Sequence, residues 1–407
     1  MITGTIFVIL VSYLLQLITV NIDFFNPITQ ALSDFKVTDV VYSKLKDKRP
    51  PEQEIVMINI GNLGRGDLAM LLNRINEYEP AVVGIDAFFK KPKDPSVDSA
   101  LAAAFSNTKK LVLVSKLDSV DHKDQFNVLI KSADVFSHSA YSGFANFITG
   151  GDEGFLTTRR FTSLQKYGDT TEYSFTAKIL SLYDPKRFAE MDKREKKLEI
   201  INYSGNLERY FKFDYPEVFD PSIDLSVIKG KIVLMGFLGE PMGEPSLTDI
   251  FFTPLNEKEA GRSHPDMYGI TVHANILSMM LGGYYIDQAP GWLDPLLAVV
   301  LCMLNVALFI WVGKRFRDFS QLSMRIIQIF EGVVLTGLMF YLLTVKDYNV
   351  DFTITLVLVF LTADLAEIYE GTAKTIVEQV EVRLQISNHR RKRKKALSDQ
   401  SSIKGSQ

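Results

Sequence analysis

Apolar residues run almost without interruption through four stretches of the chain. The first, residues 1–22, contains no charged residue, and the other three cover 292–312, 326–345 and 352–368. A helix needs about 20 mainly apolar residues to cross the hydrocarbon core of a bilayer. The pattern therefore predicts four transmembrane helices, one N-terminal and three C-terminal.

These segments have alternative interpretations. Residues 1–22 are long enough for a cleaved signal peptide, but they lack a basic start and an Ala-x-Ala-like exit, which favours an uncleaved anchor. The last three segments would suit the core of a soluble helical domain. However, three long apolar runs within 292–368 leave too little polar surface to face water, which favours the membrane.

The distribution of Lys and Arg predicts the orientation. The loop 313–325 holds four basic residues, whereas 346–351 holds one lysine against two aspartates. Because cytoplasmic loops carry an excess of Lys and Arg, we expect 313–325 and the basic tail, 369–407, in the cytoplasm. Counting back through the spans then places residues 23–291 outside. The sequence predicts a multi-pass protein of the inner (plasma) membrane.

Between the first and second spans, short aliphatic runs alternate with segments of helical periodicity. Strands are predicted at 53–61, 81–89, 110–117 and 231–237, and helices at 67–80, 95–108 and 268–283. Such alternation implies a mainly parallel sheet with helices on its faces. The predicted fold is an α/β extracytoplasmic domain, 23–291, which begins with an amphipathic linker helix over 28–48 before its α/β core.

The formal net charge of −3 conceals an uneven distribution. Residues 1–313 hold 31 Lys+Arg and 38 Asp+Glu, whereas 370–407 hold 9 and 4, which suggests different compartments. The tail contains a basic run, Arg390, Arg391, Lys392, Arg393, Lys394 and Lys395. We expect it to contact anionic lipid at ~1 kcal/mol per basic residue. Nucleic-acid binding is the less favoured alternative.

Motifs for catalysis are missing from the sequence. It has no phosphate-binding loop of the Walker type, no G-x-S-x-G elbow and no kinase signature. The five histidines show no metal-ligand spacing, and the single cysteine, Cys302, rules out an internal disulfide and a Cys-based zinc cage. We therefore predict a protein that is not an enzyme and holds neither metal nor cofactor.

Five polar residues are candidates for a ligand-binding site, each with a plainer alternative. Asp86 ends a predicted strand, where ligands bind in open parallel sheets, or it satisfies a turn or the next helix. Arg159 and Arg160 suit bidentate binding of an anion, or form a solvated pair at a strand edge. His273 and Asn275 lie in a segment of helical periodicity. Their side chains are predicted either to contact a ligand or to be buried and bond to neighbouring backbone.

Two ionisable residues, Glu331 and Asp364, fall inside the predicted third and fourth spans. An ionisable group within a membrane is costly and is usually partnered or functional. Two carboxylates at one depth would suit a proton path. The plainer interpretation is pairing with Arg325 or Lys314 near the interface, or a third helix that begins later.

The order of several stretches resembles the CHASE sensory domain of the second type, an extracellular sensor associated with bacterial cyclases and kinases. The matching stretches are DFKVTDVVYSKLK (34–46), IVMINIG (55–61), VVGIDAFF (82–89), DSALAAAF (98–105), GFANF (143–147), DEGFLTTRRF (152–161), INYSG (201–205), KGKIVLMGF (229–237), DIFFTPL (249–255) and YGITVHANILSMML (268–281). With the flanking helices, the resemblance covers roughly residues 23–370. Three transmembrane helices after the sensor are also usual in this family.

The resemblance implies a sensor, but members of the family usually continue into an output domain. Here fewer than 40 residues follow the last predicted span. We therefore expect a receptor that binds an unidentified extracytoplasmic ligand and signals through a separate membrane or cytoplasmic partner protein. Apolar residues at 4-3-4 spacing within 365–386 would support a short coiled-coil stalk, which suggests an oligomer.

Two other classes of function stay open. One is a structural or accessory subunit of a membrane protein complex that senses nothing. The other is an enzyme or transporter that uses Glu331 and Asp364.

Overall fold

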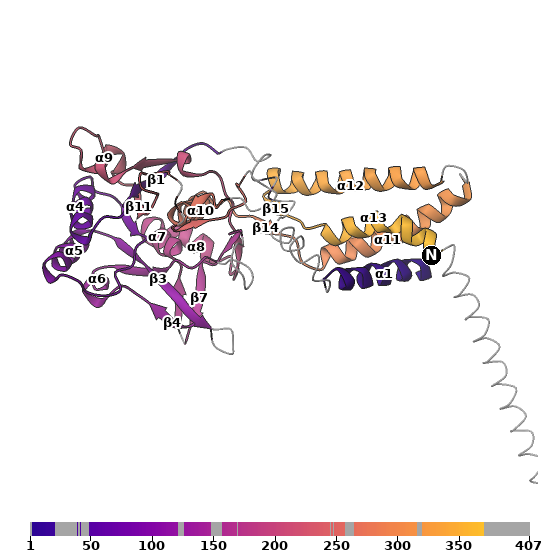
Figure 1. Cartoon of the computed structure of the whole chain (residues 1–407), viewed down its shortest axis with the longest axis horizontal. Coiled ribbons are helices and arrows are strands. Elements are labelled where there is room, and N and C mark those ends of the chain that lie inside the picture. Colours follow the sequence, from indigo (N-terminus) through magenta and orange to yellow (C-terminus); the bar gives the residue numbers. More distant parts are fainter. Residues whose placement is uncertain are drawn as a thin grey trace, which may run out of the picture. The chain divides into compact units, whose positions relative to one another are not determined.

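The computed structural model divides the chain into two compact units. The α/β unit comprises 30–287 with 343–347, and the helical unit comprises 1–29, 288–342 and 348–407 (Figure 1). The described residues are 2–20, 39, 41, 49–120, 126–147, 157–168, 170–244, 246, 248–256, 264–315 and 320–369. The basic tail and nearly all of the predicted linker helix lie outside them.

Nine strands in the described part of the α/β unit form one sheet, in the order β10-β1-β11-β2-β3-β4-β7-β8, with β5 also paired to β3. The parallel strands are β1 (Glu52–Asn59), β2 (Val82–Ile85), β3 (Leu111–Val120), β5 (Tyr141–Phe144), β10 (Tyr210–Phe213) and β11 (Ile232–Gly236). They confirm the four predicted strands and the mainly parallel sheet. A partly antiparallel extension follows, made of β4 (Phe126–Ile130), β7 (Leu164–Tyr167) and β8 (Thr170–Tyr173).

The position of β11 determines which loops lie together at the carboxyl end of the parallel strands. It lies between β1 and β2, so that Leu234 pairs with Met57 on one side and with Gly84 on the other. A strand from late in the chain is thus inserted between the first two. The loops that follow these three parallel strands consequently emerge side by side.

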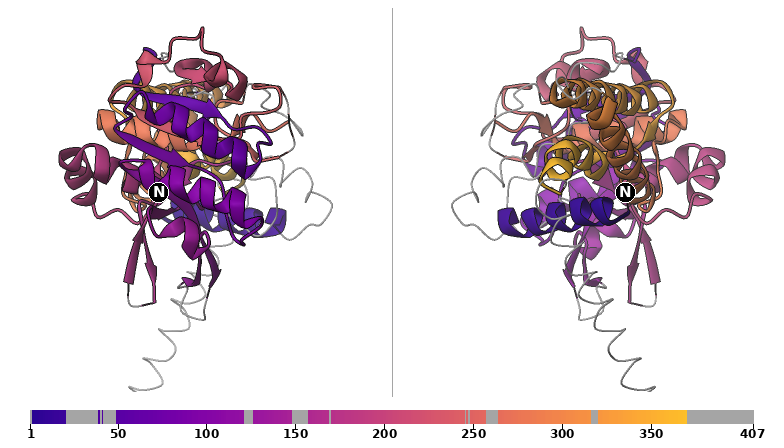
Figure 2. Two further views of the ribbon diagram at one scale, coloured as in Figure 1. Left: turned by 90° about the vertical axis from the view of Figure 1, so that its left-hand side faces the viewer. Right: turned by 90° about the vertical axis from the view of Figure 1, so that its right-hand side faces the viewer.

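Helices cover both faces of the sheet. One face carries α4 (Arg65–Asn76), α5 (Pro95–Asn107), α6 (Asp134–Ser137) and α9 (Tyr215–Phe219), and α4 and α5 lie in front of the sheet in the left view of Figure 2. The other face carries α7 (Phe175–Tyr183), α8 (Pro185–Asp192) and α10 (Gly269–Gly282). Alternate strand residues therefore pack into two apolar layers.

Glycines let the second helical layer approach the strands closely. A Cβ on Gly84 would lie 2.6 Å from the side chain of Ile179 in α7. One on Gly236 would lie 2.7 Å from Ile270 in α10. Both positions require a residue without a side chain because real Cβ contacts are longer.

The helix boundaries follow local signals. Asp94 caps α5 by accepting hydrogen bonds from Ser96 N (2.8 Å) and Val97 N (3.3 Å). The left-handed Gly283 ends α10, as the sequence indicates. The helix predicted over 67–80 is shorter, because α4 gives way to a turn in which Glu79 has a φ of 52°.

Short elements complete the α/β unit. Two short antiparallel strand pairs are β6 (Arg160–Phe161) with β9 (Glu199–Ile200), and β12 (Ile250–Phe251) with β13 (Met267–Tyr268). Two 3₁₀ helices are η3 (Leu207–Arg209) and η4 (Ser226–Ile228).

The helical unit contains α1 (Ile2–Val20), α11 (Leu293–Arg315), α12 (Ser320–Val345) and α13 (Thr353–Ile368), with the short strands β14 (Asp287–Gln288) and β15 (Tyr348–Asn349) at its edge. Among the described residues, two segments are long and apolar enough to cross a membrane, Leu293–Gly313 and Leu322–Val345. The other two predicted spans correspond to α1 and α13, whose described residues do not meet this criterion, and they stay predictions.

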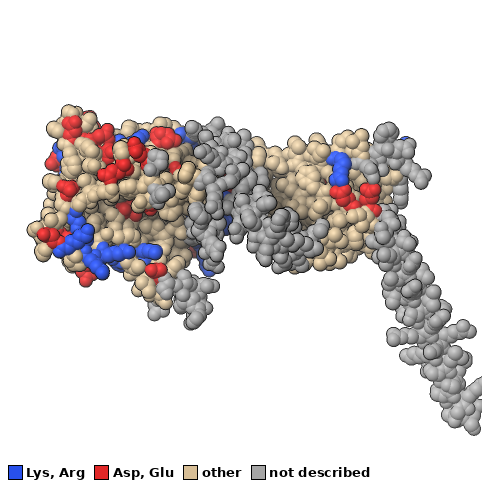
Figure 3. All heavy atoms as spheres, in the orientation of Figure 1, with Lys and Arg blue, Asp and Glu red and all other residues tan. Residues whose placement is uncertain are grey.

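The surface of the helical unit is apolar. Phe330 and Val333 of α12 are 67% and 65% exposed, whereas Cys302 and Val306 of α11 are buried against α13 and α1. In Figure 3 most described side chains on the visible face of this unit are uncharged, and the charged ones gather near one end. A water-soluble helix would be expected to expose polar side chains instead.

Candidate functional site

A cleft of about 680 Å³ opens where three parallel strands end. Ile60 follows β1, Asp86 follows β2 and Phe237 follows β11. The described residues that line this strand-end cleft are Ile60, Asn62, Asp86, Ala87, Phe88, Phe237, Glu240, Ser246, Thr248 and Asp249. Open parallel sheets bind their ligands at this edge, outside the carboxyl ends of the strands.

Asn59, the last residue of β1, holds two walls of the cleft together. Its side-chain oxygen accepts hydrogen bonds from Gly61 N (3.1 Å) and Leu238 N (2.8 Å). Its amide group donates to Gly239 O (2.9 Å) and to Asp214 Oδ1 (2.9 Å). Asn59 is fully buried, so these bonds replace water that the side chain loses on folding.

The charged side chains of the lining are all acidic. They are Asp86, Glu240 and Asp249, and no Lys, Arg or His is among the described residues of the lining. Loss of water, together with the nearby charge of Asp249, raises the pKa of Asp86 to about 7. Loss of water also raises the pKa of Asp249, which lies exposed at the rim. Asp86, half-buried, is the more strongly perturbed carboxyl group.

Aromatic rings stand beside these carboxylates. Phe88, three residues after the end of β2, is 37% exposed. Phe237 packs edge-on against Tyr268, with 5.8 Å between ring centroids. The cleft thus combines acidic groups with two phenylalanine side chains.

The cleft is connected to the start of α10. The carbonyl oxygen of Asp249 accepts a 3.0 Å hydrogen bond from Gly269 N, the first residue of that helix. A Cβ on Gly269 would lie 2.9 Å from Asp249 Oδ1, so glycine permits the approach. Asp249 itself has a φ of 53°, a left-handed conformation that is rare for a residue with a side chain.

Of the five predicted ligand-binding residues, only Asp86 lines this cleft. It does not cap the following helix, because Asp94 does so. Arg159 makes a bidentate contact with Asp39, with Nε–Oδ1 at 3.0 Å and Nη2–Oδ2 at 2.5 Å. Arg160 lies in β6 and pairs through its backbone with Ile200. The bidentate geometry predicted for Arg159 is thus directed at a carboxylate of the same chain.

His273 and Asn275 lie inside the unit, away from the cleft lining. His273 is 4% exposed and packs against the rings of Phe147 and Phe175 at 4.5 and 5.2 Å. Burial lowers the pKa of His273 to about 3, which keeps its ring neutral. Asn275 accepts from Ser204 N (3.0 Å) and donates to Gly205 O (3.0 Å), which matches the plainer alternative for it.

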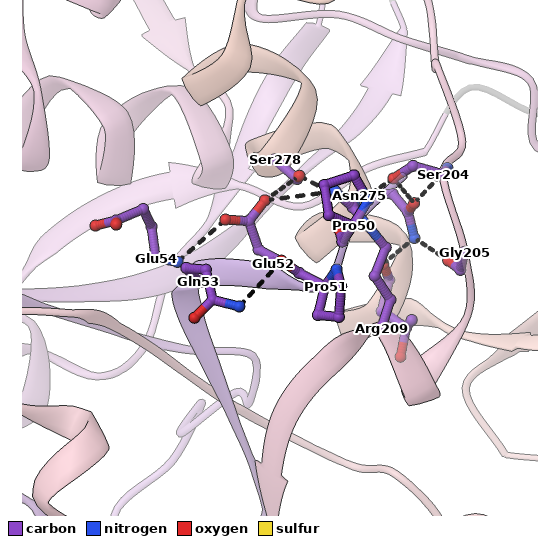
Figure 4. A network of polar contacts seen from close by, with 11 residues as sticks. Pro50, Pro51, Glu52, Gln53, Glu54, Ser204, Gly205, Arg209, Asn275 and Ser278 are labelled. Atoms are coloured by element: carbon purple, nitrogen blue, oxygen red, sulfur yellow. Dashed lines mark hydrogen bonds and ion pairs between the residues drawn. The ribbon is translucent and has the colours of Figure 1, made fainter. Parts of the chain in front are cut away.

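Asn275 borders a buried polar network at the beginning of β1 (Figure 4). Arg209 donates to Ser278 Oγ (3.1 Å) in α10 and lies 3.7 Å from the carboxylate of Glu52. Glu52 also accepts a hydrogen bond from Ser278. Through this network β1 and α10 are tied at the end of the sheet opposite the cleft.

The two carboxylates predicted inside the membrane have separate partners in the helical unit. Glu331 in α12 accepts a 2.7 Å hydrogen bond from the amide of Asn305 in α11. Asp364 in α13 pairs with Arg325 in α12, the partner that the plainer interpretation named. Helix α12 begins at Ser320, earlier than the predicted start of the third span, so Arg325 belongs to the helix itself.

Most of the residues that line the cleft were not predicted from the sequence. Asp249 and Phe237 lie in the DIFFTPL and KGKIVLMGF stretches, and Asn59 interrupts the apolar strand IVMINIG. A polar residue in an otherwise apolar strand was the available signal for Asn59. The described residues contain no group of three or more His, Cys, Asp or Glu side chains placed to hold a metal ion. The arrangement is suited to binding a small molecule.

Comparison with known proteins gives one match. The family model of the CHASE2 domain matches residues 14–313, which is most of the chain. Neither the curated proteins nor the solved structures include a match.

Proposed function

Because the chain belongs to the CHASE2 family, a family of sensory extracellular domains, we propose that it is a membrane-anchored receptor. In this proposal the α/β unit lies outside the cytoplasm and binds a small ligand in the strand-end cleft. The protein acts by binding rather than by catalysis. It passes the stimulus to a separate partner protein.

The observation that carries the proposal is the position of the cleft. Four of the stretches that resemble the family, IVMINIG, VVGIDAFF, KGKIVLMGF and DIFFTPL, each contribute lining residues. They come from distant parts of the chain and meet at the edge where parallel sheets bind ligands. A purely structural subunit would not need an open cleft with poorly solvated carboxylates at this place.

The apolar surface of α11 and α12 supports the membrane anchor. Segments Leu293–Gly313 and Leu322–Val345 have mean hydropathies of 2.6 and 1.9, yet most of each is not buried within the protein. Contact of these apolar side chains with lipid carries no free-energy penalty, whereas their exposure to water is unfavourable. Multi-pass insertion in the inner membrane, with 313–325 and the tail in the cytoplasm, is part of the proposal.

Contacts within the α/β unit supply a route for the stimulus. Asp249 at the cleft holds the first residue of α10, and Ser278 near the end of α10 holds Glu52. A ligand that binds two arrangements of the cleft unequally would shift the position of α10. Helix α10 precedes α11 in the chain, and β1 follows α1, so both ends of the route lead to helices of the helical unit.

A second set of contacts lies where these connections leave the α/β unit. The guanidinium of Arg49 lies 3.9 Å above the ring of Tyr284 and 3.9 Å from the carboxylate of Asp347. Asn202 donates to Tyr284 O (2.8 Å) and to Asp347 Oδ1 (3.1 Å). Asp347 joins α12 to α13 through β15, so three connecting segments meet at one corner of the α/β unit.

Cysteine labelling tests the proposed orientation. In a Cys302→Ser background, which has no other cysteine, Lys109→Cys introduces a thiol on the surface of the α/β unit and Ser401→Cys one in the tail. A membrane-impermeant maleimide should label position 109 in intact cells and position 401 only in inside-out vesicles. Labelling in the reverse order would overturn the receptor proposal.

The partner can be sought separately. Purification from native membranes in mild detergent should recover a partner protein whose association changes with the ligand state. A constitutive, stoichiometric complex that never changes would favour the accessory-subunit alternative.

A further inference from the structure

The strand-end cleft has features that specify a class of ligand. Building on the proposed sensor function, we infer that the cleft binds an organic ammonium ion, whose charge lies against Asp86 and Asp249 and whose apolar part contacts Phe88 and Phe237. The inference depends on four observations: the charge of the lining, the unpartnered carboxylates, the aromatic walls and the size of the cavity.

The charge of the lining selects a cation. Among the described residues of the lining, three carry carboxyl groups and none is basic. An anionic ligand would meet like charge and would find no guanidinium or ammonium group among these residues. A cation placed there would be attracted by the ionised carboxylates and would favour ionisation of Asp86.

Two of the three carboxylates have no partner within the described chain. Glu240 accepts a hydrogen bond from Asn62, but the side-chain carboxylates of Asp86 and Asp249 accept none from any described residue. For the half-buried carboxylate of Asp86, the lack of a donor is unfavourable. An ammonium group carries N–H donors and a positive charge, so it would satisfy both requirements at once.

The aromatic walls favour an organic ammonium over a bare ion. Cations are attracted to the faces of aromatic rings, and such contacts recur where proteins recognise alkylammonium ligands. The cleft presents Phe88 and Phe237 next to the acidic groups. A metal ion would instead require several oxygen ligands converging on one point, and the described residues contain no such group.

The cavity has the size of a small-molecule site. Its volume of about 680 Å³ falls within the 300–1,000 Å³ that is usual for ligand pockets. A single inorganic ion would leave most of this volume to water. An amine with an apolar body of several carbon atoms would fill it and cover both phenylalanines.

Calorimetric titration of the full-length protein in lipid nanodiscs tests the inference. The probe is phenylethylammonium, and the matched compounds are the neutral 3-phenylpropanol and the anionic 3-phenylpropionate, all at one ionic strength. We expect the cation to bind and the anion not to. Equal or tighter binding of 3-phenylpropionate, or failure of phenylethylammonium to bind, would overturn the inference.

Charge-removing variants locate the binding. Asp86→Asn and Asp249→Asn should each weaken phenylethylammonium about 10- to 100-fold, the usual effect of losing one charged hydrogen-bond partner. Glu208→Gln removes the same charge at an exposed position outside the lining and should leave affinity unchanged. Thermal unfolding of each variant verifies that it is folded. Affinity that survives the Asp86→Asn/Asp249→Asn double variant would contradict the assignment.

Two further outcomes separate this inference from the function on which it depends. If Mg²⁺ or Ca²⁺ binds in an Asp86-dependent manner and phenylethylammonium does not compete, the ligand class is wrong although the cleft is a site. If position 109 is labelled from outside but no cation binds, the receptor orientation stands and the ligand class fails. If position 401 is labelled in intact cells and position 109 only in inside-out vesicles, the sensor proposal is wrong regardless of the calorimetric result.

Discussion

The side-chain oxygen of Asn59 accepts a 2.8 Å hydrogen bond from the backbone N–H of Leu238, which links the end of β1 to the loop after β11. The two residues are far apart in the sequence and become neighbours because β11 lies next to β1. One buried amide thereby fixes the distance between two walls of the strand-end cleft. The shape of the candidate site depends on this contact as much as on the groups that line it.

Replacing Asn59 should destabilise the α/β unit. Asn59→Ala leaves the buried N–H of Leu238 and the carbonyl of Gly239 without a partner, at a cost of about 2–4 kcal/mol in unfolding free energy. Thermal and denaturant unfolding of the detergent-solubilised protein measure the change. Asn62→Ala, at an exposed position of the same loop, is the control and should stay within about 0.5 kcal/mol. Equal losses for both variants would show that Asn59 is not the organising residue.

Stability should depend on pH through Asp86. Its pKa is about 7 in the folded state against an ordinary value of 3.8, so the folded state holds the proton more tightly. The stability that this provides is complete below pH 3.8 and is lost as the pH rises through 7. Asp86→Asn cannot ionise, so above pH 7 it should exceed the parent by about 1–2 kcal/mol, a fraction of ~1.4 kcal/mol per pKa unit because Asp86 is only half-buried.

Asp98 supplies the control of opposite sign. Burial opposes its ionisation, but the N–H of Lys93 and the guanidinium of Arg65 hold its pKa below the ordinary value. Its contribution is present above pH 3.8 and is lost as the pH falls through the lowered value. Asp98→Asn should therefore be less stable than the parent at neutral pH. An Asp86→Asn curve that runs parallel to the parent between pH 4.5 and 8 would contradict the first statement. An Asp98→Asn variant that is as stable as the parent throughout this range would contradict the second.

Breaking the buried network at the start of β1 should be costly. Arg209 and Glu52 are only 8% and 12% exposed, and Arg209→Met would leave the Glu52 carboxylate without its cation. We expect a loss of about 3–5 kcal/mol, measured by thermal unfolding. Lys229→Met removes a cation from the exposed pair with Glu79 and should cost about 0–1 kcal/mol. A small loss at Arg209 would mean that water reaches Glu52.

Asn305 and Glu331 should be energetically coupled within the helical unit. A double-mutant cycle with Asn305→Ala and Glu331→Ala isolates their 2.7 Å hydrogen bond from other effects. We expect a coupling of about 0.6–1.7 kcal/mol, as for hydrogen bonds between membrane helices, measured by unfolding in mixed detergent and SDS micelles. A cycle of Leu304→Ala with Glu331→Ala should be additive, because Leu304 is exposed on the same helix. Additivity in both cycles would argue against the bond.

Two glycines should respond to alanine with opposite signs. Gly236→Ala places a Cβ 2.7 Å from Ile270 and should cost about 1–3 kcal/mol by separating β11 from α10. Gly66→Ala, in the first turn of α4, meets nothing closer than Val97 at 3.7 Å and should gain about 0.5–1 kcal/mol. The midpoints of thermal unfolding of the two variants are compared with that of the parent protein. A stable Gly236→Ala variant would show that α10 can move away from the sheet.

Local chemistry explains which elements were predictable. The strand at 53–61 and the helix at 95–108 were found because a short apolar run and helical periodicity are properties of neighbouring residues. The helix predicted over 67–80 was too long at its C-terminal end, because α4 ends at Asn76 and the chain turns at Glu79. Asp86 was found because a carboxylate after a buried strand has a defined position in a parallel sheet.

Partners that are distant in the sequence explain what was missed. Arg159 makes the bidentate contact for which its side chain is suited, but its partner is Asp39, 120 residues earlier in the chain. Nothing in the sequence around Asp39 indicates this pairing. His273 similarly gave no sign that Phe147 and Phe175 would enclose it. The chemistry of a side chain limits the groups that it can bind, whereas the tertiary structure determines which of these groups lies next to it.

The sequence by itself determined the alternation of strands and helices, the apolar helices at both ends and the residues that resemble the family. These features follow from the period of neighbouring side chains and need no knowledge of distant contacts. Only the tertiary structure decided that Asp86 and Asp249 face one cleft between Phe88 and Phe237. That outcome follows from the insertion of β11 between β1 and β2, since strand order is fixed by the packing of the whole sheet and not by any local run of residues.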